Sequence, residues 1–368
     1  MSEPEPAWEV QLKEQSQTLA HVRTGLQSWM RERLEDPGLR LSGLRPPAGT
    51  GVANETILFE VERSSGALEG YVARLATPDP LYLDDDLERH YRMYEAMMSQ
   101  PSIPTPAVLG FEADNSDLGA FFVMERVEGL VPADSPSWAT TGFVFDAEPA
   151  QRRALWEDTV RMMVDLHSLE IGPFEFLRSH ETSSGMGDCL EHWRRSLRWA
   201  NGEDRVPLVG ECESWLLKNL PEQTGLSWGD SRLPNVIYRD FRPVALLDWD
   251  LVSLGGPQAD LAWWIILEPP ESRQLEGIGS PQELVGRWEE LTGQHADQLR
   301  WYLAFGAYRL AAILAKLFSM MAAKGHMSEE QVHAALVGGS HVRLMAGLLD
   351  LTPPSGVTPL LPALRLEG

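Results

Sequence analysis

Cysteine is scarce in this chain of 368 residues, which contains only Cys189 and Cys212. Neither belongs to a Cys-x2-Cys motif or a histidine-rich cluster, and this argues against both a disulfide scaffold and a zinc site. The first residues are acidic and lack the basic segment followed by an apolar segment that marks a signal sequence. We therefore expect a cytoplasmic protein.

The sequence also lacks the features of membrane and nucleic-acid partners. Its longest apolar stretch, residues 303–323, is interrupted by Arg309 and Lys316 and predicts a buried helix rather than a membrane span. Lysine and arginine total 31 against 54 aspartate and glutamate residues, a net charge of −23. Such a chain should repel nucleic acid and anionic lipid, and no basic patch with interleaved aromatic residues offsets this. The charge would attract a cationic substrate, although solubility alone also explains it.

The hydrophobic pattern changes near residue 128 and divides the chain in two. Before this point it predicts helices at 9–35 and 84–99 and strands at 57–61, 70–75, 108–112 and 120–127. Beyond it the pattern predicts helices at 149–169, 189–200, 208–220, 281–291, 296–323 and 328–350, with strands at 236–238 and 244–247. We predict an α+β chain with a small sheet part, residues 1–127, and a mainly helical part, residues 128–368.

The densest chemistry lies in residues 226–261. Asp230 is followed five positions later by Asn235, and the second of the two short strands ends on Asp248. If these strands form a hairpin with 239–243 as its turn, the three side chains meet at one rim. An aspartate that takes a proton, with an asparagine and an aspartate as oxygen ligands for magnesium, is what phosphoryl transfer requires. The alternative is a loop in which these side chains satisfy their own backbone.

Three further features carry weaker signals. Gly49 and Gly51 lead into the first strand, where small residues would let backbone N–H groups approach a phosphate, although an ordinary turn explains them as well. Arg74 ends the second strand and either reaches a phosphate or lies at the surface as a strand-end charge. His167 fits a packed or capping histidine better than a general base.

The segments Trp228–Asn235 and Leu247–Leu261 resemble the His-Gly-Asp-x4-Asn, Asp-Trp-Glu and Gly-Asp-Pro-x2-Asp-Leu motifs of the aminoglycoside phosphotransferase and choline kinase family. Segments Gly51–Thr56, Tyr71–Arg74 and Phe122–Gly129 look closest to the kinase-like domains fused to acyl-CoA dehydrogenases. The resemblance implies a protein-kinase-like, two-lobed fold, with a small N-terminal antiparallel sheet lobe and a larger, mainly helical C-terminal lobe.

The resemblance also implies a role for each residue that matches a motif. Asp230 would be the catalytic base, Asn235 and Asp248 would hold Mg²⁺, and Asp260 would anchor the catalytic loop. ATP or GTP would be bound by the turn of Gly51, Val52, Ala53 and Asn54 over the phosphates, by Arg74 in place of a lysine, and by the hinge of Met124, Glu125, Arg126 and Val127 beside the base. The implied activity is transfer of the γ-phosphoryl group to a hydroxyl of a small molecule.

The sequence departs from the family pattern at three positions. Trp228 replaces the usual histidine and is expected to remove a polar group that helps to hold the loop. On the second helix, His90 stands where relatives have a glutamate that pairs with the strand lysine, so either Glu88 substitutes for it or the pair is absent. Asp250 replaces a more common glutamate and should be tolerated.

The acceptor and one rival class stay open at this point. An aminoglycoside fits the family name and the acidic surface, since carboxylates attract a polycation. A hydroxyacyl-CoA-type or other metabolic hydroxyl fits the closer subgroup, and residue spacing does not decide between them. The rival class is a catalytically weak nucleotide-binding module. Trp228 and His90 favour it, whereas the complete set of Asp230, Asn235 and Asp248 argues against it.

Overall fold

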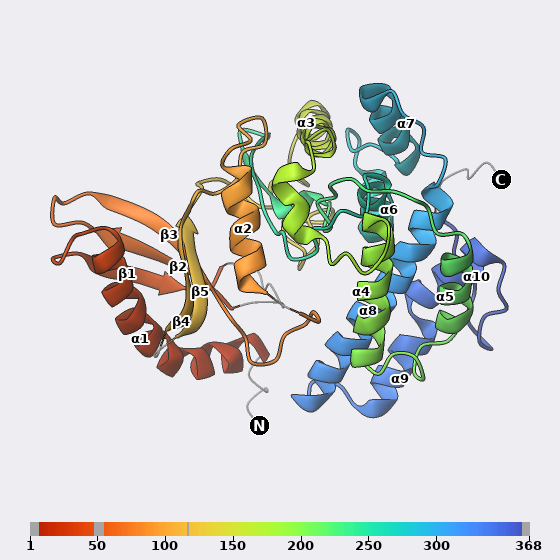
Figure 1. The fold of residues 1–368 in the computed structure, drawn as a ribbon, viewed down its shortest axis with the longest axis horizontal. Coiled ribbons are helices and arrows are strands. Elements are labelled where there is room, and N and C mark those ends of the chain that lie inside the picture. Colours follow the sequence, from red (N-terminus) through yellow and green to blue (C-terminus); the bar gives the residue numbers. More distant parts are fainter. Residues whose placement is uncertain (1–6, 48–54, 85, 116–117, 363–368) are drawn as a thin grey trace. The chain divides into compact units, whose positions relative to one another are not determined.

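The computed structural model describes residues 7–47, 55–84, 86–115 and 118–362 (Figure 1). The expected phosphate-covering turn of Gly51, Val52, Ala53 and Asn54 lies outside these residues. The chain forms two compact units. The first contains Met1–Pro80, Asp86–Met98 and Pro106–Val127, and the second contains Leu81–Asp85, Ser99–Thr105 and Glu128–Gly368. Two short segments from the N-terminal part of the chain thus belong to the helical unit.

The first unit is a five-stranded antiparallel sheet with two helices. Its strands are β1 (Arg40–Arg45), β2 (Glu55–Glu62), β3 (Leu68–Leu75), β4 (Val108–Asn115) and β5 (Gly119–Glu125), in the order β1-β2-β3-β5-β4. The helices are α1 (Ala7–Arg33) and α2 (Leu87–Met97). All four predicted strands are present, and they pair as β2 with β3 and β4 with β5. The sequence pattern misses β1, because its six residues include only two apolar side chains and a glycine.

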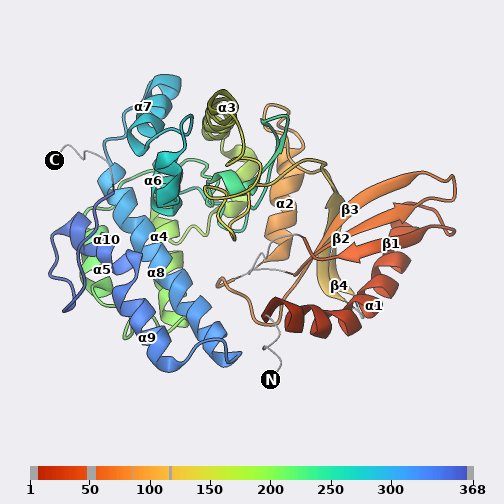
Figure 2. The same cartoon turned by 180° about the vertical axis from the view of Figure 1, so that it is seen from behind.

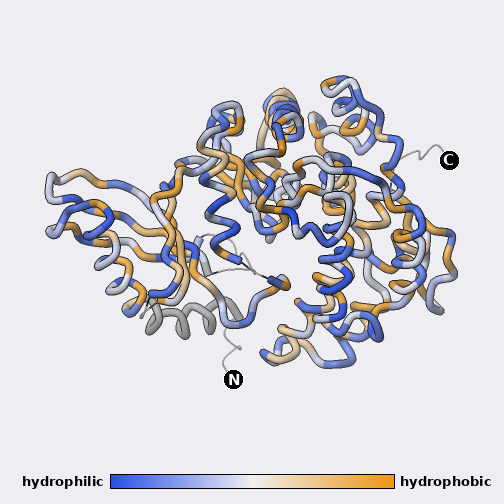
Figure 3. Tube along the Cα trace, in the orientation of Figure 1, coloured by the Kyte–Doolittle hydropathy of each residue, from blue (hydrophilic) through white to orange (hydrophobic). Residues whose placement is uncertain are grey.

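The two helices cover opposite faces of this sheet, because neighbouring residues of a strand point to opposite sides. On β5, Phe121 packs against Trp29 of α1 with ring centroids 5.3 Å apart, whereas Phe122 packs against Tyr94 of α2 at 5.9 Å. A hydrophobic core that includes Val22, Leu26 and Met30 lies on the α1 side. Along the strands, hydrophobic positions in orange recur between hydrophilic positions in blue (Figure 3).

The second unit is built around one long helix, α8 (Leu299–Ala323), drawn in blue in Figure 2. It contacts α4 (Gly185–Trp199), α5 (Val209–Lys218), α6 (Gln258–Leu267), α9 (Glu329–Gly338) and α10 (Ser340–Leu349). Helix α3 (Pro149–His167) packs on α7 (Pro281–Thr292) and on the hairpin of β6 (Val236–Arg239) and β7 (Arg242–Leu246). Three short 3₁₀ helices, Gly172–Leu177, Leu233–Asn235 and Pro270–Gln274, complete the unit.

Three details of this unit differ from the sequence predictions. Helix α6 is not predicted, because most of its residues are buried and it lacks a polar face. The predicted helix 328–350 is two helices, because Gly339 has an extended backbone with φ −66° and ψ 164°. The predicted turn 239–243 is shorter: Asp240 and Phe241 alone form it, with the positive φ values of a type I′ hairpin turn, 51° and 60°.

Two stretches are long and apolar enough to cross a membrane by length and composition alone, Leu299–Ala323 and Glu329–Leu349. In the first, which is α8, 67% of the tested window is buried inside the structure. This burial is typical of a core helix and agrees with the predicted buried helix. The second stretch is divided by the break at Gly339.

Candidate active site

One face of α6 holds the loop that carries Asp230. The carboxylate of Asp260, which is fully buried, accepts hydrogen bonds from the backbone N–H groups of Trp228 at 2.7 Å and Gly229 at 2.8 Å. The backbone carbonyl of Asp260 accepts a third bond, from Ser231 Oγ at 2.7 Å. The predicted role of Asp260 as an anchor beneath the loop is confirmed by these bonds.

His167, at the end of α3, holds Asp260 from a second direction. Its Nε2 lies 2.8 Å from Asp260 Oδ2, and Trp288 Nε1 of α7 donates to its Nδ1 at 3.1 Å. Because Nδ1 accepts a hydrogen bond, the ring proton is on Nε2 and points at Asp260. The side chain of His167 is thus 2% exposed and hydrogen-bonded at both ring nitrogens, which agrees with the predicted packed histidine.

Trp228 and Gly229 give the loop its shape. The buried indole of Trp228 donates from Nε1 to the carbonyl of Leu247 at 2.8 Å, which ties the loop to the residue before Asp248. The expectation that Trp228 removes a polar holding group is wrong, because the indole supplies a donor of its own. Gly229 has φ +96°, and a Cβ there would lie 2.0 Å from the carbonyl oxygen of Leu251, so only glycine fits.

The carboxylate of Asp230 is held by three side chains. Trp263 Nε1 donates to Oδ1 at 2.6 Å. Asn235 Nδ2 at 2.6 Å and Arg232 Nε at 3.0 Å both donate to Oδ2. Asp230 is 8% exposed. These contacts fix the orientation of a nearly buried carboxylate, which is the arrangement that a positioned base requires.

The hairpin of β6 and β7 brings Asn235 and Asp248 to the same end. Leu247 N donates to the carbonyl of Asn235 at 2.9 Å, so Asp248 comes directly after the residue that pairs with Asn235. Asp248 has φ +61°, a left-handed conformation that residues other than glycine seldom adopt. Such backbone strain is concentrated at functional sites. The structure thus brings the predicted trio of Asp230, Asn235 and Asp248 together.

The oxygen donors at this end fit a magnesium ion. Asn235 uses its amide nitrogen for hydrogen bonds to the backbone carbonyl and to Oδ2 of Asp230, so its amide oxygen is the atom that a cation would take. With the Asp248 carboxylate this gives two hard oxygen ligands, a set that Mg²⁺ completes with phosphate oxygens and water. In the part of the chain that the structure describes, no three His, Cys, Asp or Glu side chains are grouped to hold a metal. A magnesium ion here would therefore take its remaining ligands from bound phosphate and water.

Two side chains outside the predicted set lie among these carboxylates. Burial lowers the pKa of Arg232, but the negative charges of Asp230, Asp134 and Asp248 outweigh it and raise that pKa above its ordinary value. Arg232 Nη1 also donates to Asp134 Oδ1 at 2.7 Å. Burial raises the pKa of the Tyr82 phenol, and Asp230 and Asp248 raise it further. At neutral pH the site therefore contains a cationic guanidinium and an uncharged phenol beside its carboxylates.

The other predicted site residues belong to the first unit. Arg74 lies on β3, paired in register with Thr56 of β2 and Phe122 of β5, and is 8% exposed. It is therefore buried rather than a surface charge at a strand end. On α2, His90 is buried and Glu88 is exposed. Glu88 thus does not take the buried position on α2 that a partner of the buried Arg74 would need.

The predicted hinge begins inside β5. Met124 is buried, and the backbone N–H groups of Glu125 and Arg126 donate to the carbonyl groups of Ala107 at 2.8 Å and Gly70 at 2.9 Å. These two N–H groups stabilise the first unit, so neither is available to a nucleotide base. The structure therefore does not support a hinge in which these two N–H groups contact the base.

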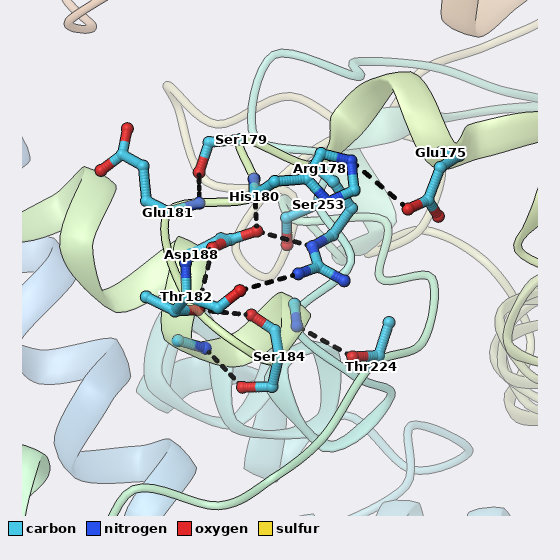
Figure 4. Close-up of polar contacts among 12 residues, drawn as sticks. Glu175, Arg178, Ser179, His180, Glu181, Thr182, Ser184, Asp188, Thr224 and Ser253 are labelled. Atoms are coloured by element: carbon cyan, nitrogen blue, oxygen red, sulfur yellow. Dashed lines mark hydrogen bonds and ion pairs between the residues drawn. The ribbon is translucent and has the colours of Figure 1, made fainter.

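A further buried aspartate lies in the first turn of α4, within the helical unit (Figure 4). Asp188 Oδ2 accepts from Arg178 Nε at 2.6 Å and from His180 N at 3.2 Å, and Oδ1 accepts from Thr182 N and Thr182 Oγ1, both at 2.8 Å. Burial raises the pKa of Asp188, but the hydrogen bonds from Arg178 and Thr182 outweigh it and hold that pKa below its ordinary value. The carboxylate thus fixes the loop that precedes α4.

The sequence model of the phosphotransferase enzyme family matches residues 45–317, about three quarters of the chain. This range includes most of the sheet, the Asp230 loop and α6. The chain belongs to this family of phosphotransferases.

A curated relative and two solved structures are similar to the chain. Acyl-CoA dehydrogenase family member 11 of Homo sapiens is 28% identical over 282 residues, which cover 71% of this chain and 35% of the relative. The chain thus spans about a third of the length of the curated relatives that it matches. A Ralstonia eutropha protein provisionally assigned as an aminoglycoside phosphotransferase has a TM-score of 0.62 at 24% identity, covering 85% of this chain and 93% of its own.

A thermostable variant of the aminoglycoside phosphotransferase APH(4)-Ia, solved with ADP and hygromycin B, has a TM-score of 0.52 at 15% identity. That match covers 85% of this chain and 96% of the other. Both structural likenesses show the fold of aminoglycoside phosphotransferases, which confirms the predicted fold class.

The sequence reading missed three residues of the site: Trp263, Arg232 and Tyr82. Trp263 follows Asp260 by three positions on α6, so both side chains leave the same face of the helix. A predicted helix at these positions would have placed Trp263 beside Asp260. Arg232 follows Asp230 by two positions in the same loop, and this spacing indicates a cation close to the carboxylate. Tyr82 carries no such signal, because it comes from a distant segment of the chain.

Proposed function

We propose that this protein is a small-molecule kinase that transfers the γ-phosphoryl group of ATP or GTP to a hydroxyl group of a small molecule. The observation that carries the proposal is the end of the β6–β7 hairpin, where the oriented carboxylate of Asp230 lies beside the oxygen donors of Asn235 and Asp248. Membership of the phosphotransferase family supports it.

Asp230 would align the acceptor hydroxyl and take its proton. Phosphoryl transfer passes through a loose transition state, so positioning and charge neutralisation supply most of the rate enhancement. Arg232, which donates to Asp230 Oδ2, provides a fixed positive charge next to the acceptor position. The indole of Trp228 keeps Asp248 in register with the Asp230 loop.

Asn235, through its amide oxygen, and Asp248, through its carboxylate, would hold Mg²⁺. When bound, this ion supplies positive charge to the phosphate oxygens of the nucleotide. In the first unit, the proposed nucleotide contacts are Arg74, the turn from Gly51 to Asn54, and the hinge from Met124 to Val127, without the N–H groups of Glu125 and Arg126, which bond within the unit. The presence of ADP in the APH(4)-Ia complex supports a nucleotide co-substrate.

Two acceptor classes follow from the two kinds of relative. Hygromycin B in the APH(4)-Ia complex supports an aminoglycoside, and the net charge of −23 would attract such a polycation. Acyl-CoA dehydrogenase family member 11, the more similar protein in sequence, supports a hydroxyl carried on an acyl thioester. We favour the thioester, since the structural likeness of APH(4)-Ia at 15% identity concerns the fold.

The decisive experiment measures Mg²⁺-dependent phosphoryl transfer from ATP and from GTP by the purified protein. The acceptors are a panel of aminoglycosides and a panel of hydroxyacyl-CoA thioesters. We expect transfer to a thioester, and an Asp230→Asn variant that loses about 10³-fold in kcat while it still binds nucleotide. Near-normal turnover by this variant would rule out Asp230 as the base. Tight nucleotide binding without turnover on any acceptor would instead support a nucleotide-binding module.

A further inference from the structure

Arg309 of α8 is a buried cation beneath the Asp230 loop. It is 4% exposed, and its Nη2 donates to the carbonyl of Gly229, the residue before Asp230. Its guanidinium carbon lies 3.6 Å from the ring centroid of Trp263 and 5.5 Å from that of Trp193. A guanidinium over an indole face at this distance is an attractive cation–π contact, and it is strongest where water is excluded.

Arg309 keeps its charge in this position. Burial lowers its pKa to about 10, while the carboxylates of Asp230 and Asp260, with Tyr82 and Cys189, oppose that fall. A group with this pKa is protonated at neutral pH. The buried cation therefore lies on one face of the same indole whose N–H donates to Asp230.

The donors around Asp230 leave one acceptor position open. An ionised carboxylate accepts about four hydrogen bonds, two on each oxygen. Oδ2 receives two, from Asn235 and Arg232, whereas Oδ1 receives one donor within the described residues, Trp263 Nε1. Indole is a donor only, so Trp263 orients Oδ1 without competing for a proton.

From these contacts we infer that Trp263 and Arg309 are positioning residues that present Oδ1 of Asp230 to the acceptor hydroxyl. The indole N–H fixes this oxygen, and the guanidinium stacked on the indole strengthens the N–H as a donor, because neighbouring polar contacts polarise one another. The inference rests on the proposed kinase activity and adds the atom that receives the proton and the two residues that set its direction.

In the transfer, the O–H bond of the acceptor breaks and its proton passes to Oδ1. The acceptor oxygen forms a bond to the γ-phosphorus as the bond from that phosphorus to the β,γ-bridging oxygen breaks. The electron pair of the broken bond leaves with the nucleoside diphosphate. Asp230 then returns the proton to solvent, and the Trp263 N–H keeps its proton throughout.

The first test needs no substrate. The protein contains 13 tryptophans, so ¹⁵N-indole labelling gives a small set of N–H signals, in which Trp263→Phe identifies that of Trp263. We expect this signal to shift upfield in Asp230→Asn, where the anionic acceptor is lost, and in Arg309→Met, where the stacked cation is lost. A Trp263 signal that stays in place in both variants would overturn the inference.

The second test is kinetic and uses Trp264→Phe as a matched control. Trp264 is the next residue on α6, and its Nε1 also donates to a carboxylate, Glu268 Oε2 at 2.8 Å. Trp263→Phe keeps an aromatic ring beneath Arg309 and removes the donor, and Trp264→Phe makes the same loss of ring volume at the neighbouring position. We expect it to lower kcat about 10- to 100-fold, with KM for nucleotide unchanged, whereas Trp264→Phe leaves kcat unchanged.

The outcomes separate this inference from the proposed function. Wild-type kcat in Trp263→Phe, in a protein where Asp230→Asn is inactive, would overturn the positioning role alone. Full turnover in Asp230→Asn would overturn the proposed base, while the substrate-free shift still reports on the contact. If Arg309→Met does not fold, Arg309→Lys replaces it: we expect a partial shift, since the charge stays but the planar stack is lost. No shift there, with none in Asp230→Asn, would overturn the inference.

Discussion

Asp188 and Asp230 are both nearly buried aspartates of the helical unit, 7% and 8% exposed, and both are surrounded by hydrogen-bond donors. Two donors face each oxygen of Asp188, the Thr182 hydroxyl being shared with the carbonyl of Ser184, so within the described residues all four acceptor positions face a donor. The donors of Asp230 occupy three positions, and the fourth lies on Oδ1. A saturated carboxylate stabilises a loop, and an unsaturated one can also take a proton.

The two sites also differ in where their donors come from. Every donor to Asp188 lies within the preceding ten residues, so the cluster is local. The Asp230 loop is held by Trp263 and Asp260 of α6 and by Arg309 of α8, far away in the chain. The local cluster should therefore affect stability, whereas the distant contacts should affect stability and turnover together.

Among the residues that hold these two sites, Asp260→Asn is expected to have the largest effect on the free energy of unfolding. The amide places a donor either against the N–H of Gly229 or against both the N–H of Trp228 and Nε2 of His167, so at least one buried donor loses its acceptor. We expect a loss of unfolding free energy on the order of 3 kcal/mol and a fall in kcat per folded molecule. Urea unfolding and turnover of the purified variant measure both. If stability falls and turnover does not, the Asp230 loop does not depend on its distant anchor.

A smaller effect is expected for Asp188→Asn. We expect a loss of about 2 kcal/mol in unfolding free energy, because Arg178 loses a buried charged partner. Turnover per folded molecule should match the wild type, because all donors of Asp188 come from its own loop. A large fall in kcat would contradict the distinction between the two aspartates.

Acid should remove the contribution of the Asp188 carboxylate to the stability of the protein. The pKa of this carboxyl is lowered in the folded protein. Its contribution is therefore present above the ordinary aspartate pKa of about 3.9 and is lost as the pH falls through the lower, folded-state pKa. We expect the difference in unfolding free energy between wild type and Asp188→Asn to be constant near neutral pH and to shrink in strong acid. A difference that grows as the pH falls would contradict a lowered pKa of Asp188 in the folded protein.

The smallest effect is expected for Trp228→Phe. This change keeps most of the buried ring and removes the donor to the carbonyl of Leu247, which should cost about 1 kcal/mol of stability. A modest rise in KM for Mg²⁺ should accompany it, because Leu247 precedes Asp248. Thermal unfolding and Mg²⁺ titration of activity measure these effects. An unchanged KM for Mg²⁺ would mean that the indole does not position Asp248.

Much of the fold follows from local patterns. The strand pairs and the spacing of Asp230, Asn235 and Asp248 were predictable, because a hairpin joins residues that are close in the chain. Strand β1 and helix α6 were not, since β1 has few apolar residues and α6 is buried on nearly all sides. Missing α6 also meant missing Trp263.

The sequence by itself determined the chemical groups of the site and the spacing that brings three of them to the end of one hairpin. Tertiary structure alone decided how these groups are oriented: Trp263 lies 33 positions from Asp230, Arg309 lies 80 from Gly229, and His167 lies 93 from Asp260. The reason is physical, because a hydrogen bond between distant residues depends on how their helices pack, and no local pattern of residues records that packing.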